Sequence, residues 1–184
     1  MPRVPELKLE QLNDEQKTVF EAIQRRLGGN ASLSRGPFGV LLNAPKVAFG
    51  AITAYGSFRD GKIERRLFEL MILVVARHMT AQFEWFAHAP RAVEAGIAPE
   101  TVDAIRNRRT PMLTRDDEKM VYDVVAEMCA TRTLSQASYD RALAALGLER
   151  LVELIAGTGF YVMIAMTLNA FDVAVPTGEK VLPA

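Results

Sequence analysis

The sequence predicts an all-α fold in a single domain that spans residues 1–184. Apolar residues recur at helical spacing along nearly the whole chain, and no segment alternates as a half-buried strand does. Capping residues, glycines and prolines mark the ends of about eight helices. The length of 184 residues fits one domain, and the hydrophobic content of 49% is enough for a packed core.

The first helix is expected to begin after Asn13, because Asn13 and Gln16 have the spacing of a capping box. Gly28 and Gly29 are expected to end it, since glycine tolerates the left-handed conformation that follows a helix.

Residues 30–45 are expected to form a loop, because a Gly-Pro pair and a second proline interrupt any helical pattern there. Phe38 and Asn43 are candidates to line a pocket, but simple packing of the loop is the favoured interpretation. Pro45 suits the first position of a helix, and this helix would run to about Arg59.

Residues 62–95 contain no glycine, and Pro90 is their one helix breaker. A single long helix, or two helices separated near Thr80, would fit this stretch. The part from Leu67 to Ala76 is apolar on all sides and therefore predicts a central, buried helix.

Four further helices are expected beyond this stretch, each with a proline, a capping residue or a glycine near its ends. They run from Pro99 to about Arg106, from the cap near Thr114 to about Thr131, from Ser135 to Gly147, and from Glu149 to about Asp172.

Charge and composition disfavour several classes of function. The chain has 22 basic and 22 acidic side chains, and this balance disfavours a nucleic-acid binder, which needs a basic surplus. A single cysteine, Cys129, excludes an internal disulfide and a CxxC motif. With only two histidines, no metal site is expected, and no cofactor is predicted.

The N-terminus has no apolar run of signal-peptide length. Residues 67–76 form the densest apolar stretch and fall far short of the roughly 20 residues that span a bilayer. A cytoplasmic protein without a membrane segment is therefore expected.

The stretch from Glu69 to His88 carries the candidate chemistry. Glu69 is a lone carboxylate in an apolar run, so burial would favour its neutral form and suit it to proton exchange near pH 7. The alternative is a buried ion pair with an arginine. Glu84 and His88 have i, i+4 spacing, which indicates either a carboxylate–imidazole proton shuttle or an ordinary surface pair.

On a continuous helix, Arg77, Ala81, Glu84 and His88 would share one face that could hold an acidic ligand. A break near Thr80 would remove Arg77 from this face. The spacing of Glu69, Glu84 and His88 matches neither the zinc-protease motif nor the di-iron motif.

Residues 66–77, 83–88 and 92–97 resemble the carboxymuconolactone decarboxylase family, whose superfamily includes the alkylhydroperoxidase D-like proteins. The close match covers about residues 62–106. The resemblance implies an all-helical, alkylhydroperoxidase D-like fold and homo-oligomers, either trimers or hexamers.

The peroxidase branch of this superfamily has a glutamate, a CxxC pair and a histidine. In this chain Glu69 and His88 match the glutamate and the histidine, whereas Ala81 and Glu84 stand at the two cysteine positions. Peroxidase chemistry needs both thiols. The chain therefore resembles the cysteine-less branch, which contains the decarboxylase of bacterial aromatic-compound degradation.

The resemblance implies a lyase that acts on a small organic acid or lactone. Arg77 is expected to hold the substrate carboxylate, and Trp85 is a second candidate for substrate binding. His88 would be the hydrogen-bond donor or proton carrier, Glu84 would orient it, and Glu69 would be the buried acid/base. The alternatives are a non-catalytic oligomer that binds a small apolar acid and an alkylhydroperoxidase or peroxiredoxin-type antioxidant enzyme.

Overall fold

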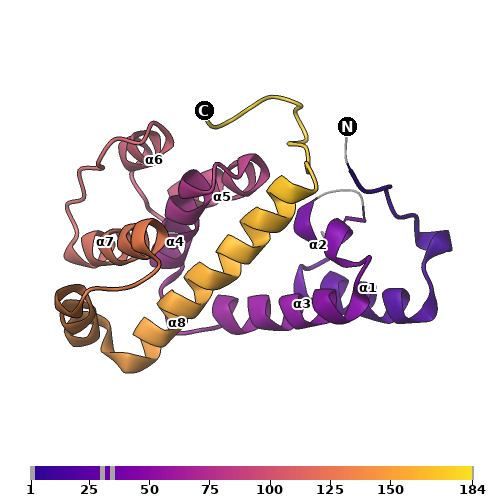
Figure 1. Cartoon of the computed structure of the whole chain (residues 1–184), viewed down its shortest axis with the longest axis horizontal. Coiled ribbons are helices and arrows are strands. Elements are labelled where there is room, and N and C mark those ends of the chain that lie inside the picture. Colours follow the sequence, from indigo (N-terminus) through magenta and orange to yellow (C-terminus); the bar gives the residue numbers. More distant parts are fainter. Residues whose placement is uncertain (1–2, 30–31, 34–35, 184) are drawn as a thin grey trace.

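The computed structural model describes residues 3–29, 32–33 and 36–183. These residues form eight α-helices, one short 3-10 helix and no strand, so the predicted all-α class is confirmed (Figure 1). The elements are η1 (Leu9–Gln11), α1 (Asp14–Arg26), α2 (Gly36–Leu41), α3 (Pro45–Arg59), α4 (Arg65–His78), α5 (Gln82–Glu94), α6 (Pro99–Arg106), α7 (Asp116–Thr131) and α8 (Gln136–Ala170).

Several predicted helix ends are confirmed. Asn13 and Gln16 form the reciprocal capping box of α1, and Gly28 and Gly29 follow that helix with positive φ angles of 64° and 80°. Pro45 lies in the first turn of α3.

The stretch 62–95 forms two helices rather than one. Thr80 adopts a φ of 51°, in the left-handed region that β-branched residues rarely enter. The chain therefore turns between α4 and α5, and the two helices pack against each other.

Two segments differ from the expected outline. Residues 36–41 form α2 inside the stretch expected to be a loop. Pro37 is compatible with this helix because it stands in the first turn, where the helix needs no hydrogen bond from its missing N–H. The last two predicted helices follow each other directly and together form α8, which is kinked at Gly147, where φ is 75°.

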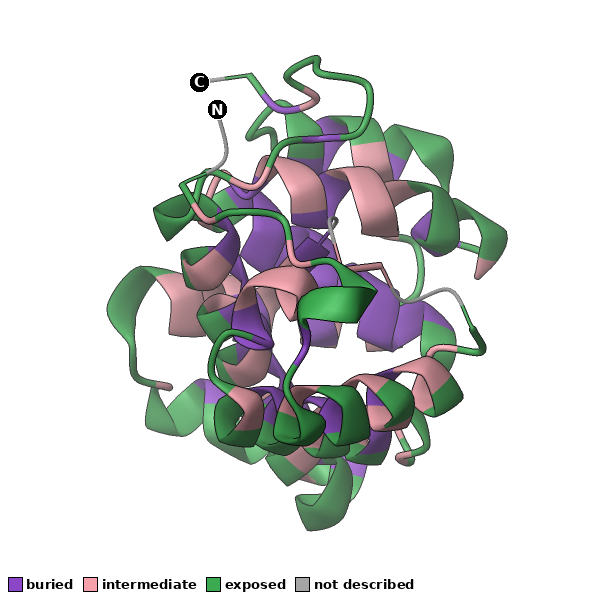
Figure 2. Ribbon diagram, turned by 90° about the vertical axis from the view of Figure 1, so that its right-hand side faces the viewer, coloured by how far each residue is buried: buried purple, intermediate pink, exposed green. Residues whose placement is uncertain are grey.

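Two hydrophobic clusters make up the core, and α8 joins them. Leu154 and Tyr161 belong to the larger cluster around α4, whereas Ile164 and Leu168 belong to the smaller cluster with α1, α2 and α3. Helix α8 crosses the molecule between these two groups of helices (Figure 1). Buried residues gather where the helices face one another, and exposed residues cover their outer sides (Figure 2).

Helix α4 is the central element, as its apolar pattern predicts. Every residue from 66 to 77 is buried, because α5, α7 and α8 pack around this helix. Arg66 is held by ion pairs to Asp117 (2.6 Å) and Glu118 (2.5 Å) of α7. These contacts fix the orientation of α4 and with it the position of Glu69.

A longer apolar stretch than residues 67–76 lies in α8. An 18-residue window of α8 has a mean hydropathy of 1.8 and is long and apolar enough to cross a membrane by length and composition alone. In this structure 44% of that window is buried inside the protein, where α8 packs on α4 and α7. The sequence reasoning missed this stretch because polar residues divide it into short apolar runs.

Candidate active site

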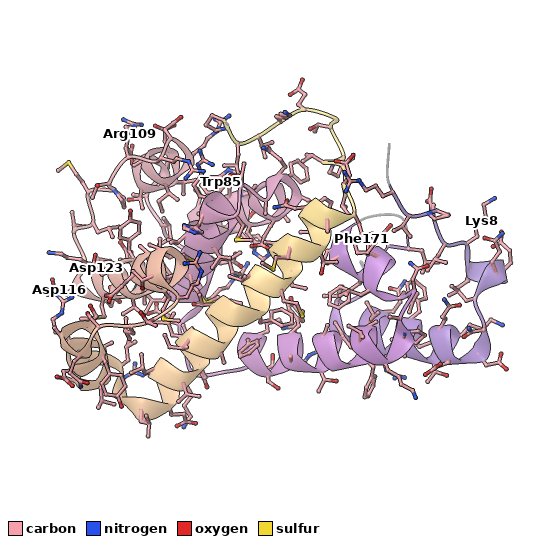
Figure 3. All side chains as sticks on the ribbon, viewed as in Figure 1. Lys8, Trp85, Arg109, Asp116, Asp123 and Phe171 are labelled. Atoms are coloured by element: carbon pink, nitrogen blue, oxygen red, sulfur yellow. The ribbon has the colours of Figure 1, made fainter. Side chains whose placement is uncertain are left out.

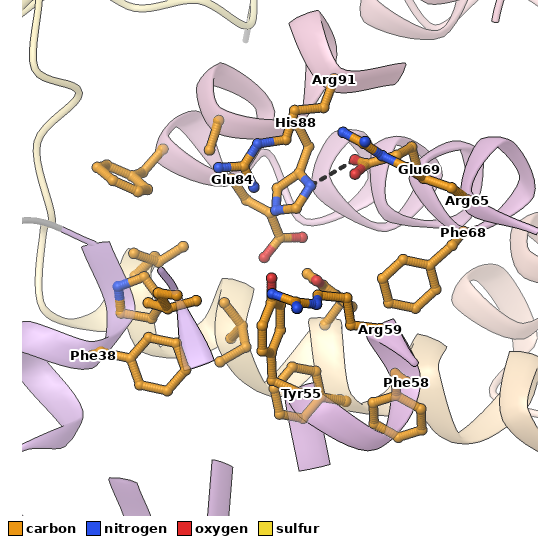
Figure 4. Close-up of a pocket in the computed structure, with 18 of the residues that line it drawn as sticks. Phe38, Tyr55, Phe58, Arg59, Arg65, Phe68, Glu69, Glu84, His88 and Arg91 are labelled. Atoms are coloured by element: carbon orange, nitrogen blue, oxygen red, sulfur yellow. Dashed lines mark hydrogen bonds and ion pairs between the residues drawn. The ribbon is translucent and has the colours of Figure 1, made fainter. Parts of the chain in front are cut away.

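A cavity of about 630 Å³ lies where the two hydrophobic clusters meet along α8 (Figure 4). Its walls come from α2, α3, α4, α5 and α8, together with the end of α1. The lining residues are Leu27, Pro37, Phe38, Tyr55, Phe58, Arg59, Ile63, Arg65, Phe68, Glu69, Phe83, Glu84, Ala87, His88, Arg91, Phe160, Tyr161, Ile164 and Leu168.

Glu69 and His88 meet in this cavity although they are 19 residues apart. The Nδ1 atom of His88 lies 2.8 Å from Oε2 of Glu69, and both side chains are largely buried. A carboxylate can only accept this hydrogen bond, so in the tautomer in which Nδ1 donates to Glu69 the Nε2 atom is left to act on a ligand. The ring of Tyr161 packs edge-on against the imidazole at 5.5 Å and helps to fix its orientation.

Glu84 lines the same cavity but does not orient His88 as predicted. The i, i+4 spacing allows a pair between Glu84 and His88. However, α5 packs on α4 so that the imidazole of His88 is hydrogen-bonded to Glu69. Glu84 is 2% exposed, and neither of its carboxyl oxygens has a hydrogen-bond partner within the described residues. Burial raises the pKa of Glu84 well above its ordinary value of 4.5, because desolvation favours the neutral carboxylic acid over the carboxylate.

Three exposed arginines stand at the rim of the cavity, one each from α3, α4 and α5 (Figure 4). Arg59 pairs with Asp60 and donates to the carbonyl oxygen of Arg26. Arg65 and Arg91 form no ion pair within the described part of the chain. The rim therefore offers two guanidinium groups to an anionic ligand.

The walls are rich in aromatic side chains, with five phenylalanines and two tyrosines. Phe38 lines the cavity and also packs against the smaller core cluster, whereas Asn43 lies outside the lining. Tyr161 is almost completely buried, and burial raises the pKa of its phenol well above 10. An apolar or aromatic body fits these walls.

Arg77 and Trp85, the residues predicted to bind substrate, are not among the lining residues of this cavity. The break at Thr80 separates Arg77 from the face of α5, and its guanidinium donates to the Thr80 hydroxyl over 3.3 Å. Trp85 follows Glu84 on α5, so it points about 100° away from the Glu84 side chain and packs into the larger core cluster (Figure 3).

The single cysteine of the chain, Cys129, lies on α7 and packs against the larger core cluster outside the cavity lining. Burial raises the pKa of the Cys129 thiol to about 11, so it stays protonated at neutral pH. The chain thus lacks the cysteine pair but is not free of cysteine. Across the described residues, no group of three or more His, Cys, Asp or Glu side chains is placed to hold a metal ion.

The sequence contained signals for two rim arginines that the prediction did not use. Glu84, His88 and Arg91 stand at positions i, i+4 and i+7 and therefore share one face of α5. The polar face thus includes Arg91 and not Arg77. Arg65 stands four residues before Glu69 on α4. Arg59 and Tyr161 come from distant parts of the chain, and no local spacing connects them to the site.

Comparison with known proteins agrees with this fold. A peroxidase-related protein from Silicibacter sp. TM1040 is 16% identical, with a TM-score of 0.70 over 94% of this chain and 90% of that chain. The debrominase Bmp8 is 14% identical in its apo structure, with a TM-score of 0.68 over 94% and 91% of the two chains. A cysteine-to-alanine variant of that debrominase, in complex with 2,3,4-tribromopyrrole, is 15% identical, with a TM-score of 0.69 over 95% and 92%.

These identities establish a shared fold and nothing about a shared reaction. None of the curated proteins matches the chain in sequence. The model of the carboxymuconolactone decarboxylase family matches residues 48–127, which include α4 and α5. The segment that holds Glu69 and His88 therefore has the sequence pattern of the carboxymuconolactone decarboxylase family, on an alkylhydroperoxidase D-like fold.

Proposed function

We propose that this protein is an acid/base enzyme, a decarboxylase-like lyase that acts on a small organic acid or lactone. The observation that carries the proposal is the Glu69–His88 pair, joined over 2.8 Å in a cavity of about 630 Å³ with arginines at its rim. The family pattern at residues 48–127 supports the same class of reaction.

The cavity suits an anion with an apolar body. Arg65 and Arg91 have no ion-pair partner among the described residues, so their guanidinium groups can bind a carboxylate at the rim, which is the role expected of Arg77. Aromatic side chains such as Phe68 and Phe160 offer the body of the ligand an apolar surface. The size of the cavity fits a small molecule rather than a polymer.

The Glu69–His88 pair can carry out the proton transfer of a decarboxylation. When the bond to the carboxylate breaks, carbon dioxide leaves and the electron pair moves into a conjugated carbonyl group as an enolate. A protonated His88 then gives its Nε2 proton to the carbon, and the imidazole takes a new proton from solvent. Glu69 orients the ring through its hydrogen bond with Nδ1.

A dithiol peroxidase reaction has less support. Ala81 and Glu84 stand where that branch has its cysteines, and Cys129 lies outside the cavity with its pKa raised to about 11. A thiolate is needed to attack a peroxide, and this chain offers none in the cavity.

The test is release of carbon dioxide from 4-carboxymuconolactone. We expect His88→Ala to lower the rate about 100-fold or more, because a positioned general acid contributes at least that much. His78→Ala is the matched control, since His78 is exposed at the end of α4 and outside the cavity. Equal rates for wild type and His88→Ala would overturn the assignment. Binding without turnover, seen as a rise in melting temperature, would instead indicate a binding protein.

We also propose that the chain forms a homo-oligomer. Large apolar side chains are exposed on α3 and on α8, among them Phe49, Val152 and Met166. Exposed apolar surface is typical of protein–protein contacts, and a formal net charge of zero does not oppose self-association.

A further inference from the structure

Among the described residues that line the cavity, only Glu84 has buried side-chain polar atoms without a hydrogen-bond partner. Both of its oxygens are buried and have no hydrogen-bond partner. The two other buried glutamates among the described residues each have a partner. Glu69 is hydrogen-bonded to His88, and Glu118 accepts a hydrogen bond from Arg66. Buried polar atoms in folded proteins almost always have a partner, so the missing partner of Glu84 is expected to be a ligand.

The carboxyl group faces the space that a ligand would fill. Glu84 is a lining residue of the cavity, and its carboxyl points into the cavity beside His88 (Figure 4). Glu84 and His88 lie one helical turn apart, a spacing of roughly 5–6 Å between side chains on a helix face. One small molecule can therefore contact both groups at once.

The charged and titratable groups around Glu84 come from four helices. They are His88 and Arg91 on α5, Glu69 and Arg65 on α4, Tyr55 and Arg59 on α3, and Tyr161 on α8. The arginines lie at the exposed rim, whereas Glu69 and Tyr161 are buried beside the site. Desolvation keeps the proton on Glu84 and raises its pKa, so the side chain presents one O–H donor to the cavity.

We propose that Glu84 donates a hydrogen bond to a carbonyl oxygen of the substrate, so that the cavity selects small acids that carry a carbonyl group next to the reacting carbon. The proposal rests on the acid/base function proposed for this cavity and names its substrate class. Rim arginines bind the carboxylate, Glu84 binds the carbonyl oxygen, and His88 reaches the carbon between them. As an enolate forms, its negative oxygen gains from a neutral acid and would be repelled by an ionised one.

The test compares two probes that differ only at the carbonyl group. Benzoylacetate carries a carbonyl where 3-phenylpropionate has a methylene, next to the carbon that bears the carboxylate. Both probes have one carboxylate and one phenyl ring. We expect the wild-type protein at pH 7 to bind benzoylacetate about tenfold or more tightly than 3-phenylpropionate in calorimetric titration. A hydrogen bond to a buried group has this order of effect on affinity.

Three variants assign the preference to Glu84. Glu84→Ala should bind both probes equally, whereas Glu84→Gln keeps a donor and should retain the preference. Glu94→Gln is the matched control, because Glu94 is exposed on the same helix and outside the cavity lining. The wild-type preference should decline at high pH as Glu84 ionises, and that of Glu84→Gln should not.

The outcomes separate this proposal from the proposed function. A wild-type protein that binds neither probe, or binds both equally, overturns the role of Glu84. A preference that Glu84→Ala leaves intact overturns it too. A preference that Glu84→Ala abolishes supports it, even if wild type releases no carbon dioxide from 4-carboxymuconolactone. In that case the proposed reaction fails and the carbonyl-binding site stands.

Discussion

At the scale of single residues, two glutamates in one cavity have different partners because their surroundings differ. Glu69 is buried but bonded to the Nδ1 atom of His88. Glu84 is buried without a hydrogen-bond partner in the described chain, and desolvation alone raises its pKa. The sequence places both on helices but does not reveal this difference. It depends on how α5 packs on α4.

Glu84→Gln should change how stability depends on pH. Above about pH 4.5 the unfolded chain releases the Glu84 proton, whereas the folded protein keeps it because its pKa is raised. The contribution of Glu84 to the free energy of unfolding therefore falls as pH rises, by up to about 1.4 kcal/mol per pH unit, until the folded pKa is reached. Glutamine does not titrate, so Glu84→Gln should not show this fall.

Urea unfolding at pH 5, 6 and 7 measures the effect. The free energy of unfolding of Glu84→Gln should rise relative to wild type across this range, and that of the exposed control Glu94→Gln should stay parallel to wild type. Parallel curves for Glu84→Gln and wild type would mean that Glu84 is ionised in the folded protein.

Arg91→Gln should weaken substrate binding at the rim. It removes a guanidinium that forms no ion pair within the described residues, so a bound carboxylate would lose a charge-assisted hydrogen bond. We expect the KM for 4-carboxymuconolactone to rise about tenfold. The control Arg25→Gln removes an exposed charge from α1, outside the cavity lining, and an equal rise in its KM would show that only net charge matters.

At the scale of helices, the sequence was most informative where a local signal decides the structure. The capping box at Asn13 and the glycines after α1 depend on neighbouring residues, and both predictions are confirmed. The sequence does not decide between one helix and two at Thr80, because no glycine or proline marks the break. That break decides the site, since it separates Arg77 from the face of α5.

The close approach of α8 to α4 should depend on Gly157. A Cβ atom at this position would lie 3.2 Å from the sulfur of Met71 and 3.7 Å from the ring of Phe68, whereas a Cβ atom at Gly159 would meet open space. Gly157→Val should therefore lower the free energy of unfolding by about 1–3 kcal/mol relative to Gly159→Val. Both variants place valine in the same helix, so chemical denaturation of the pair isolates the packing effect. Equal stabilities would contradict this packing.

At the scale of the whole molecule, the cavity exists because α8 joins two hydrophobic clusters. Phe38 of α2, Tyr55 of α3 and Tyr161 of α8 all line the cavity. Phe38 and Tyr161 are more than a hundred positions apart in the sequence. No periodicity connects such residues, so the sequence could not predict the walls. The meeting of Glu69 and His88 was inferable only from the family resemblance.

The proposed homo-oligomer should dissociate when its apolar surface becomes charged. Met166 is exposed on α8, and Met166→Lys would place an ammonium group in a contact that excludes water. Light scattering after size exclusion should show wild type as an oligomer and Met166→Lys as a smaller species. A monomeric wild type would contradict the proposed assembly.

The central claim is that Glu69 and His88 act as one unit, and a double-mutant cycle on decarboxylation of 4-carboxymuconolactone tests it most directly. Glu69→Ala, His88→Ala and the double variant are compared with wild type by their kcat/KM values. If the pair acts together, the double variant loses no more activity than His88→Ala alone. Losses that multiply, or a Glu69→Ala variant as active as wild type, would contradict the account.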